Sequence, residues 1–142
     1  MPLAVQIVTA ERSVLEDVVD MVVAPGSEGV LGILPHHAPL IAILKPGELR
    51  LKKGSGEVAI AVYGGIMQVE PDRVRILADA AEHADEIDEA RAREALERAR
   101  NAMIGAHDKQ DMAGLQAAIE RANVQVRIAE RHHRRPHEAP PA

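Results

Sequence analysis

The sequence predicts an α+β protein of two domains, in which a flattened antiparallel β-sandwich or barrel precedes an α-helical hairpin. Before Ala84, short apolar runs alternate with Gly and Pro turns, whereas after it two long segments carry apolar side chains at helical spacing. No helical segment separates the strands of the first half, which argues against a βαβ fold. The expected domains are 1–84 and 85–132, followed by a disordered tail at 133–142.

The first half contains short strands bounded by turn-forming residues. From Leu3 onward, apolar residues alternate as in a strand with one buried face. Gly and Pro supply the positive or fixed φ values that tight turns need, and they recur at Pro25-Gly26, Pro46-Gly47, Gly54-Ser55-Gly56, Gly64-Gly65 and Pro71-Asp72. The expected strands between them cover residues 3–10, 18–24, 30–34, 38–44, 47–52, 57–63, 66–70 and 73–77.

The second half predicts two helices that pack against each other. Asp88 is the expected N-cap of the first helix, which should end at Gly105, and Asp111 is the expected cap of the second. Each helix has an apolar stripe: Ala92, Ala95, Leu96, Ala99, Ala102 and Met103 in the first, and Leu115, Ala118, Ile119, Ala122, Val126 and Ala129 in the second. Because both stripes are rich in Ala, little apolar area is buried per turn, and we expect a weakly held, movable hairpin.

The composition excludes several classes of function. The 142 residues are 46% hydrophobic, carry a net charge of −5, and include no cysteine and a single aromatic residue, Tyr63. The chain therefore lacks the stacking platforms and the basic surface of nucleic-acid-binding modules, as well as thiolate and disulfide chemistry. The region Met1–Arg12 does not resemble a signal peptide, and the uncharged stretch Gly29–Leu44 is too short and too interrupted to span a bilayer. We expect a protein that is not inserted in the membrane.

No catalytic residue, metal ligand or required cofactor is expected. The segment Pro25–Gly29 has Pro where a nucleophile elbow needs its first Gly, and the chain has neither a phosphate-binding Gly-Lys-Ser loop nor an H-E-x-x-H pair. The adjacent His36 and His37 fit a solvated turn better than a metal site. The sequence thus indicates a protein that is not an enzyme by itself.

Several motifs, in their order and spacing, resemble the epsilon subunit of bacterial F-type ATP synthase. They are residues 26–35 (GSEGVLGILP), 37–40 (HAPL), Pro46-Gly47, Gly64-Gly65, 76–79 (ILAD) and 87–92 (IDEARA), the last of which is similar to the family's nucleotide-sensing motif. The resemblance covers Leu3 to about Glu130.

The resemblance implies a non-catalytic rotor subunit that couples proton translocation to ATP synthesis. Its β-sandwich is expected to dock on the gamma subunit of the central stalk and on the c-subunit membrane ring. Its mobile hairpin is expected to inhibit ATP hydrolysis when it extends into the catalytic alpha/beta head. The implied location is peripheral, on the cytoplasmic face of the bacterial inner membrane.

The resemblance also implies binding residues. The partner-binding positions correspond to Glu28, Val30 and His37, although Val30 stands where an acidic residue is common and His36 where Gly is common. In members that bind ATP as a regulatory ligand, the binding positions correspond to Glu82, Ile87, Asp88, Arg91, Ala92, Arg98 and Arg121. Gln125 stands where those members have Arg.

The inhibitory role that the resemblance implies suggests a contact for the basic residues of the second helix. A basic run on the second helix and its end can meet acidic surfaces of the catalytic head, and it comprises Arg121, Arg127, Arg131, Arg134 and Arg135.

The helical arginines allow two interpretations. Arg91 and Arg98 share a face of the first helix, and together with Arg121 they can chelate phosphate if the borders of the two stripes lie adjacent. Alternatively they belong to a solvated face with ordinary i,i+4 ion pairs, namely Glu94–Arg98 and Glu89–Arg93. The alternative function for the whole chain is a free-standing anion- or nucleotide-sensing module with no larger complex.

Overall fold

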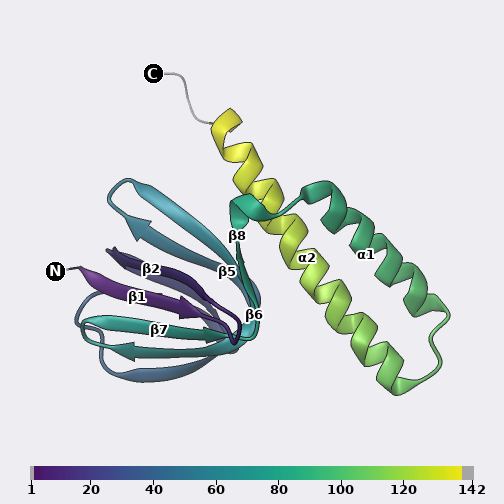
Figure 1. Ribbon diagram of the computed structural model, residues 1–142, viewed down its shortest axis with the longest axis horizontal. Helices are drawn as coiled ribbons and strands as arrows, with labels where there is room; N and C mark the ends of the chain where they lie inside the picture. The colour runs from purple at the N-terminus through teal and green to yellow at the C-terminus, as the bar shows by residue number, and fades with distance from the viewer. Residues whose placement is uncertain (1, 139–142) are drawn as a thin grey trace. The chain divides into compact units, whose positions relative to one another are not determined.

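The computed structural model describes residues 2–138, with side chains up to residue 132. The chain forms two compact units, one that ends at His83 and one that begins at Ala84 (Figure 1). The first unit is built from strands and the second from two long helices with a short 3-10 helix before them. The predicted fold class is confirmed.

The strands of the first unit form one folded-over sheet. The sheet order is β2-β1-β7-β6-β5-β3-β4, and β8 pairs with β6. All of these pairs are antiparallel except β1 with β7. The strands are β1 (Leu3–Val8), β2 (Ser13–Val19), β3 (Met21–Gly26), β4 (Gly29–Ile33), β5 (Leu40–Lys53), β6 (Gly56–Glu70), β7 (Arg73–Ala78) and β8 (Ala81–His83).

Three of the five predicted turns lie in strands instead. Pro25-Gly26 ends β3, and the turn itself follows at Ser27-Glu28. Pro46-Gly47 lies inside β5 and Gly64-Gly65 inside β6, at neighbouring positions of the same ladder. Leu44 pairs with Gly65 and Pro46 with Tyr63, so the pairing steps over one residue on each strand at this point. The two long strands curve here, and the sheet folds over on itself (Figure 1). Each of these strands therefore replaces two of the shorter strands that we predicted.

Gly65 is required by this bend for two reasons. Its φ is +143°, a conformation that L side chains rarely adopt. A Cβ at this position would also collide with the Leu77 carbonyl oxygen of β7 and lie 2.8 Å from the Ala78 Cα. Because both obstacles are backbone atoms, they cannot move aside as a side chain would.

The predicted strand at 18–24 is wrong, because a corner at Asp20 divides it between β2 and β3. The Asp20 N–H donates to the Lys52 carbonyl at 2.7 Å, and its carboxylate accepts the Gly54 N–H at 2.7 Å. These bonds join the corner to the β5–β6 turn, where Gly54 has a φ of +60° as that predicted turn requires. The prediction also missed β8, which has only three residues.

The core of the first unit is aliphatic, as the composition predicts. The largest fully buried side chains include Leu3, Ile7, Leu49, Ile60 and Met67, and no polar side chain is buried within the described residues. The core is therefore packed without aromatic rings.

The second unit consists of η1 (Ala84–Glu86), α1 (Glu89–Ile104) and α2 (Lys109–Glu138), and the two α-helices pack as a hairpin. Asp88 caps α1 as predicted, since its Oδ1 accepts the Arg91 N–H at 3.2 Å, and the helix ends before Gly105. The predicted cap Asp111 is wrong. Asp108 starts α2 instead, because its Oδ1 accepts the Gln110 N–H at 2.8 Å and its carbonyl accepts the Met112 N–H.

The apolar seam differs in part from the predicted stripes. Ala92 and Ala99 are buried on α1, and Ala122, Val126 and Ala129 on α2, whereas Ala102 and Ala118 are exposed. The exposed pair lies at one edge of each stripe, as the helical spacing requires. Val124 and Ile128 are also buried, so the second half of α2 buries apolar residues on a second face that the stripe did not include.

The second helix is longer than predicted. It continues to Glu138, so residues 133–138 of the expected tail are helical, and the rest of that tail lies outside the described residues. Pro136 removes one backbone N–H donor in this last part of the helix, whereas the basic residues there are favoured because they oppose the helix dipole. No helix within the described residues is long and apolar enough to cross a membrane.

Candidate functional site

An exposed row of apolar side chains crosses four strands of the first unit. Ile43 of β5 pairs with Ile66 of β6, Ile66 with Leu77 of β7, and Leu77 with Val8 of β1. The exposed fractions of Ile43, Ile66 and Leu77 are 65%, 47% and 59%. We call these four residues the apolar row. Large apolar side chains gathered on an exposed face mark an interaction surface.

A polar row borders the apolar row two residues further along each strand. Gln68 of β6 pairs with Arg75 of β7, which in turn pairs with Gln6 of β1. The Arg75 Nε donates to the Gln6 Oε1 at 3.5 Å. On β5 the corresponding position is apolar: Ile41, which pairs with Gln68, is 70% exposed. The face therefore combines an apolar strip with a flanking cation.

Two of the three predicted partner-binding residues lie in a hollow that adjoins this face. Glu28 and Val30 line it together with Ile41 and Ile43 of β5, and Val30 is 71% exposed. His37 does not line the hollow; it is half-buried, and its Nδ1 lies 2.8 Å from the Ala38 carbonyl oxygen. The apolar row was not predicted from the sequence, although its member Ile43 and the neighbouring Ile41 belong to the uncharged stretch Gly29–Leu44.

The predicted nucleotide-binding residues fall in both units. Glu82 belongs to the first unit, where its carboxylate accepts a hydrogen bond from the Tyr63 hydroxyl. The other six belong to the second unit: Ile87 and Ala92 are buried, and Asp88, Arg91, Arg98 and Arg121 are exposed.

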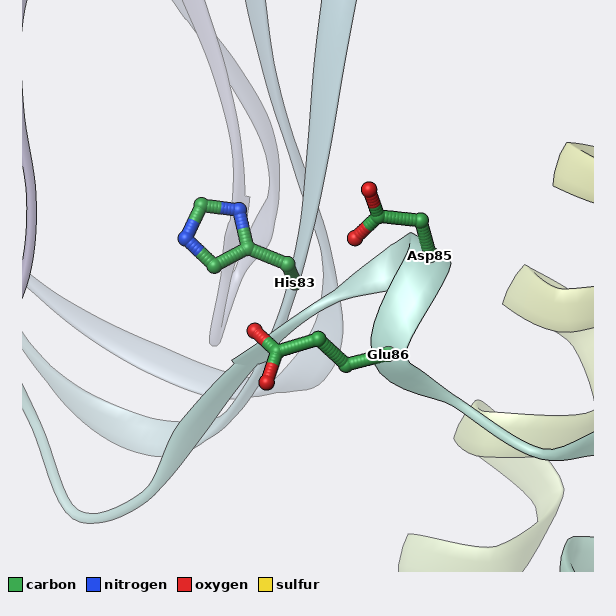
Figure 2. A group of neighbouring side chains, drawn as sticks. All are labelled: His83, Asp85 and Glu86. Carbon is green, nitrogen blue, oxygen red and sulfur yellow. The ribbon is translucent and has the colours of Figure 1, made fainter.

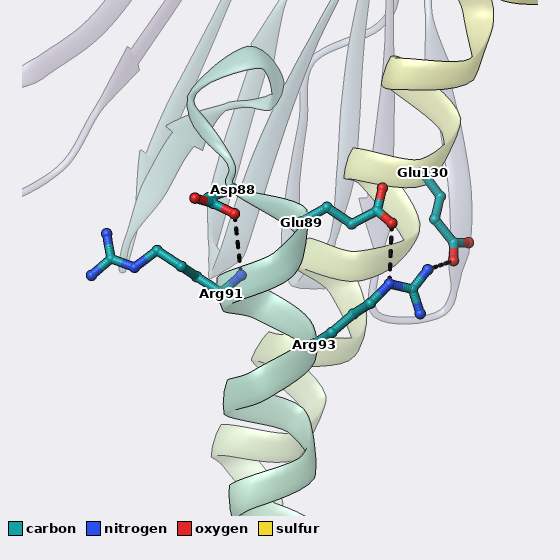
Figure 3. Close-up of polar contacts among 5 residues, drawn as sticks. All are labelled: Asp88, Glu89, Arg91, Arg93 and Glu130. Atoms are coloured by element: carbon teal, nitrogen blue, oxygen red, sulfur yellow. Dashed lines mark hydrogen bonds and ion pairs between the residues drawn. The ribbon is translucent and has the colours of Figure 1, made fainter.

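Among these residues, the structure brings Asp88 and Arg91 together through the cap of α1 (Figure 3). Arg91 and Arg98 share an exposed face of α1 because they are seven residues apart. Gln125, where ATP-binding members have Arg, is half-buried on α2.

The alternative ion pairs are present only in part. Arg93 Nε donates to Glu89 Oε2 at 3.1 Å, as predicted, whereas Glu94 and Arg98 form no ion pair within residues 2–132. The Arg93 guanidinium also binds the Glu130 carboxylate of α2 (Figure 3). Its contacts with Glu89 first and Glu130 second raise the pKa of Arg93 above its ordinary value.

The basic run of α2 is described only as far as Arg131. Arg121 and Arg127 are exposed and Arg131 is half-buried, whereas the side chains of Arg134 and Arg135 lie outside the described part. An inhibitory role of these residues stays a prediction.

His83, Asp85 and Glu86 follow one another closely in the chain, and their ligand atoms lie within 4.8 Å of one another (Figure 2). The His83 Nε2 lies 3.2 Å from the Val14 carbonyl oxygen, and both carboxylates are exposed. Exposed acidic groups at such spacing are common without a metal, so we assign none here.

A folded-over sheet with an exposed apolar row, followed by a charged helical hairpin, defines a two-domain docking protein. The chain belongs to the family of ATP synthase delta/epsilon chains: the model of the beta-sandwich domain matches residues 2–84, and that of the long alpha-helix domain matches residues 85–130. The resemblance seen in the sequence is thereby confirmed.

Individual proteins agree with this membership. The chain is 50% identical over 129 residues to the ATP synthase epsilon chain of Herpetosiphon aurantiacus, which covers 91% of this chain and 95% of that relative. It is 49% identical over 135 residues to the epsilon chain of Dehalococcoides mccartyi, covering 94% and 96%.

Solved structures share the fold. One is a chain of the Euglena gracilis mitochondrial ATP synthase, with a TM-score of 0.80, 23% identity, and coverage of 91% of this chain and 81% of that one. Another comes from the central stalk and c-ring of the Tetrahymena thermophila mitochondrial ATP synthase, with a TM-score of 0.57, 16% identity, and coverage of 93% and 96%. At these identities the likeness concerns the fold alone.

Proposed function

We propose that this chain is the epsilon chain of a bacterial F-type ATP synthase, a non-catalytic subunit of the central stalk. The observation that carries the proposal is the 50% identity to an ATP synthase epsilon chain over almost the full length of both proteins. In this role the chain works at the cytoplasmic face of the inner membrane, is held there by its partners, and turns with the rotor.

The first unit supplies the docking surface. A partner that covers the apolar row removes its side chains from water. This burial stabilises the complex by roughly 25 cal/mol per Å² of apolar surface. We assign this face to the gamma subunit of the stalk, and the residues Glu28, Val30 and His37 to contacts near the c-subunit ring. Arg75, which flanks the row, would pair with an acidic residue of the partner.

The hairpin supplies the regulation. Its seam contains the small side chains of Ala92, Ala99, Ala122 and Ala129, so closing it buries little apolar area and opening it is inexpensive. When open, α2 can present its arginines to the alpha/beta head and inhibit ATP hydrolysis. Bound ATP would favour the closed hairpin if Arg91, Arg98 and Arg121 gather around its phosphates.

The test uses the assembled enzyme with the full chain or with a chain that lacks residues 84–142. Removal of the hairpin should raise ATP hydrolysis and leave proton-driven ATP synthesis in the same membranes largely intact. Unchanged hydrolysis would show that this hairpin is not inhibitory.

Co-purification tests the stalk assignment separately. The tagged full chain should retain the gamma subunit through purification from its own cells. Recovery as a monomer with a tightly bound nucleotide would instead favour the free-standing sensing module.

A further inference from the structure

Arg93 joins the two helices of the hairpin at the end where the chain enters α1. Its guanidinium binds Glu89 on its own helix and Glu130 on α2, which is 37 residues away in sequence. The Arg93 side chain is 51% exposed and the two glutamates are each 32% exposed. This ion pair connects α1 to α2.

This contact lies on a different side of α1 from the predicted phosphate-binding arginines. Two residues along an α-helix correspond to a rotation of about 200°, so Arg91 and Arg93 leave α1 on nearly opposite sides (Figure 3). Arg98 shares the face of Arg91 because it follows seven residues later. A ligand held by Arg91 and Arg98 therefore does not need Arg93, and the Arg93 contact does not need a ligand.

We propose that Arg93 is a charge latch that holds the hairpin closed in the absence of nucleotide. Glu89 positions the guanidinium, and Glu130 receives it from the other helix. An exposed ion pair contributes little to the stability of a protein with a large apolar core. The seam here consists mostly of alanines, so even a small contribution from the ion pair shifts the balance between closed and open hairpins. The proposal rests on the proposed function, in which the hairpin opens.

The test measures the separation of the two helices in the full chain. Because the chain has no cysteine, A90C and A117C, at exposed positions of α1 and α2, can carry spin labels without further changes. Arg93→Ala and Glu130→Gln should each raise the separated population about two- to fivefold. Salt at about 1 M, where the Debye length falls to about 3 Å, should raise it in the parent chain and not in Arg93→Ala.

Arg100→Ala is the matched control. Arg100 lies seven residues after Arg93 on the same face of α1, is exposed, and forms no ion pair within the described residues. Its removal should leave the separation unchanged. The reversed set E89K/R93E/E130R should restore closure, because it rebuilds the same contacts with opposite charges.

The latch is refuted if Arg93→Ala behaves like Arg100→Ala, or if the reversed set stays as open as Arg93→Ala. Should Arg93→Ala lose helical circular dichroism, Glu130→Gln decides, since it leaves α1 unchanged. Parallel hydrolysis assays separate this inference from the proposed function. If Arg93→Ala opens the hairpin but leaves ATP hydrolysis unchanged, the latch is supported and the inhibitory role of the hairpin is contradicted. If the hairpin inhibits hydrolysis but Arg93→Ala does not change the helix separation, the latch is contradicted.

Discussion

Ile43 of β5 lies directly opposite Ile66 of β6, and both side chains face solvent rather than the core. The Cβ atoms of directly opposed residues in an antiparallel pair lie about 5 Å apart, so the two side chains form one continuous apolar surface. This relationship makes the apolar row the most testable part of the docking proposal.

The variant I43Q/I66Q should bind the gamma subunit about tenfold more weakly, because two apolar contacts at the centre of the interface are lost. Stability should change little, since both side chains are already exposed. Surface plasmon resonance and urea unfolding measure the two quantities. Val58→Gln, also on an exposed position of β6, is the control and should bind normally. Equal binding by the parent chain, I43Q/I66Q and Val58→Gln would place the stalk contact elsewhere.

Gly65→Ala should destabilise the first unit by about 2 kcal/mol or more, because the new Cβ meets the backbone of β7 in a strained conformation. Gly54→Ala is the comparison: its φ is also positive, at +60°, but a Cβ there meets nothing within 4 Å, and the expected loss is about 1 kcal/mol. Urea unfolding of the full chain followed by circular dichroism gives both values. Similar losses at the two sites would mean that close approach at Gly65 is unimportant.

Asp17 should make the stability of the chain sensitive to acid. The Val18 N–H, which donates to its carboxylate at 2.7 Å, and then Lys53 hold the pKa of Asp17 below its ordinary value of 3.8. The charged form therefore stabilises the fold above the unfolded-state pKa. That contribution is lost as the pH falls from about 5 through the lower folded-state pKa.

Asp17→Asn should accordingly lose less stability than the parent chain between pH 7 and about pH 3. Lys53→Met should show the same trend more weakly, because the bond from Val18 remains. Urea unfolding at both pH values gives the comparison. A drop in Asp17→Asn as large as that of the parent would assign the acid sensitivity to other carboxylates.

Gln125→Arg should tighten ATP binding about ten- to a hundred-and-fiftyfold, the range expected for one added hydrogen bond to a charged group. Arg91→Ala should abolish binding, whereas Arg100→Ala should have no effect because Arg100 lies on the face of Arg93. Calorimetric titration of the isolated chain gives the affinities. If neither the parent nor Gln125→Arg binds ATP, the arginines are a solvated face.

Local patterns in the sequence determined the order of the elements and the family. The change from strand alternation to helical spacing near Ala84, the cap at Asp88 and the turn at Gly54 depend on near neighbours in the chain. The same is true of the motifs that revealed the epsilon subunit family. The Glu89–Arg93 pair was predictable for this reason as well, since its partners are four residues apart on one helix.

Contacts between distant residues decided what the sequence left open. Gly64-Gly65 predicts a turn from local sequence alone, and only the pairing of Gly65 with Leu44 of β5 shows that it lies inside a strand. Glu130 could be matched to Arg93 only once the alignment of the two helices was known. The segment 40–44 is apolar at every position, so alternation could not tell which face of the strand is buried. The folding of the sheet buries Leu44 and leaves Ile41 and Ile43 in solvent, because only one face of the strand meets the opposite layer.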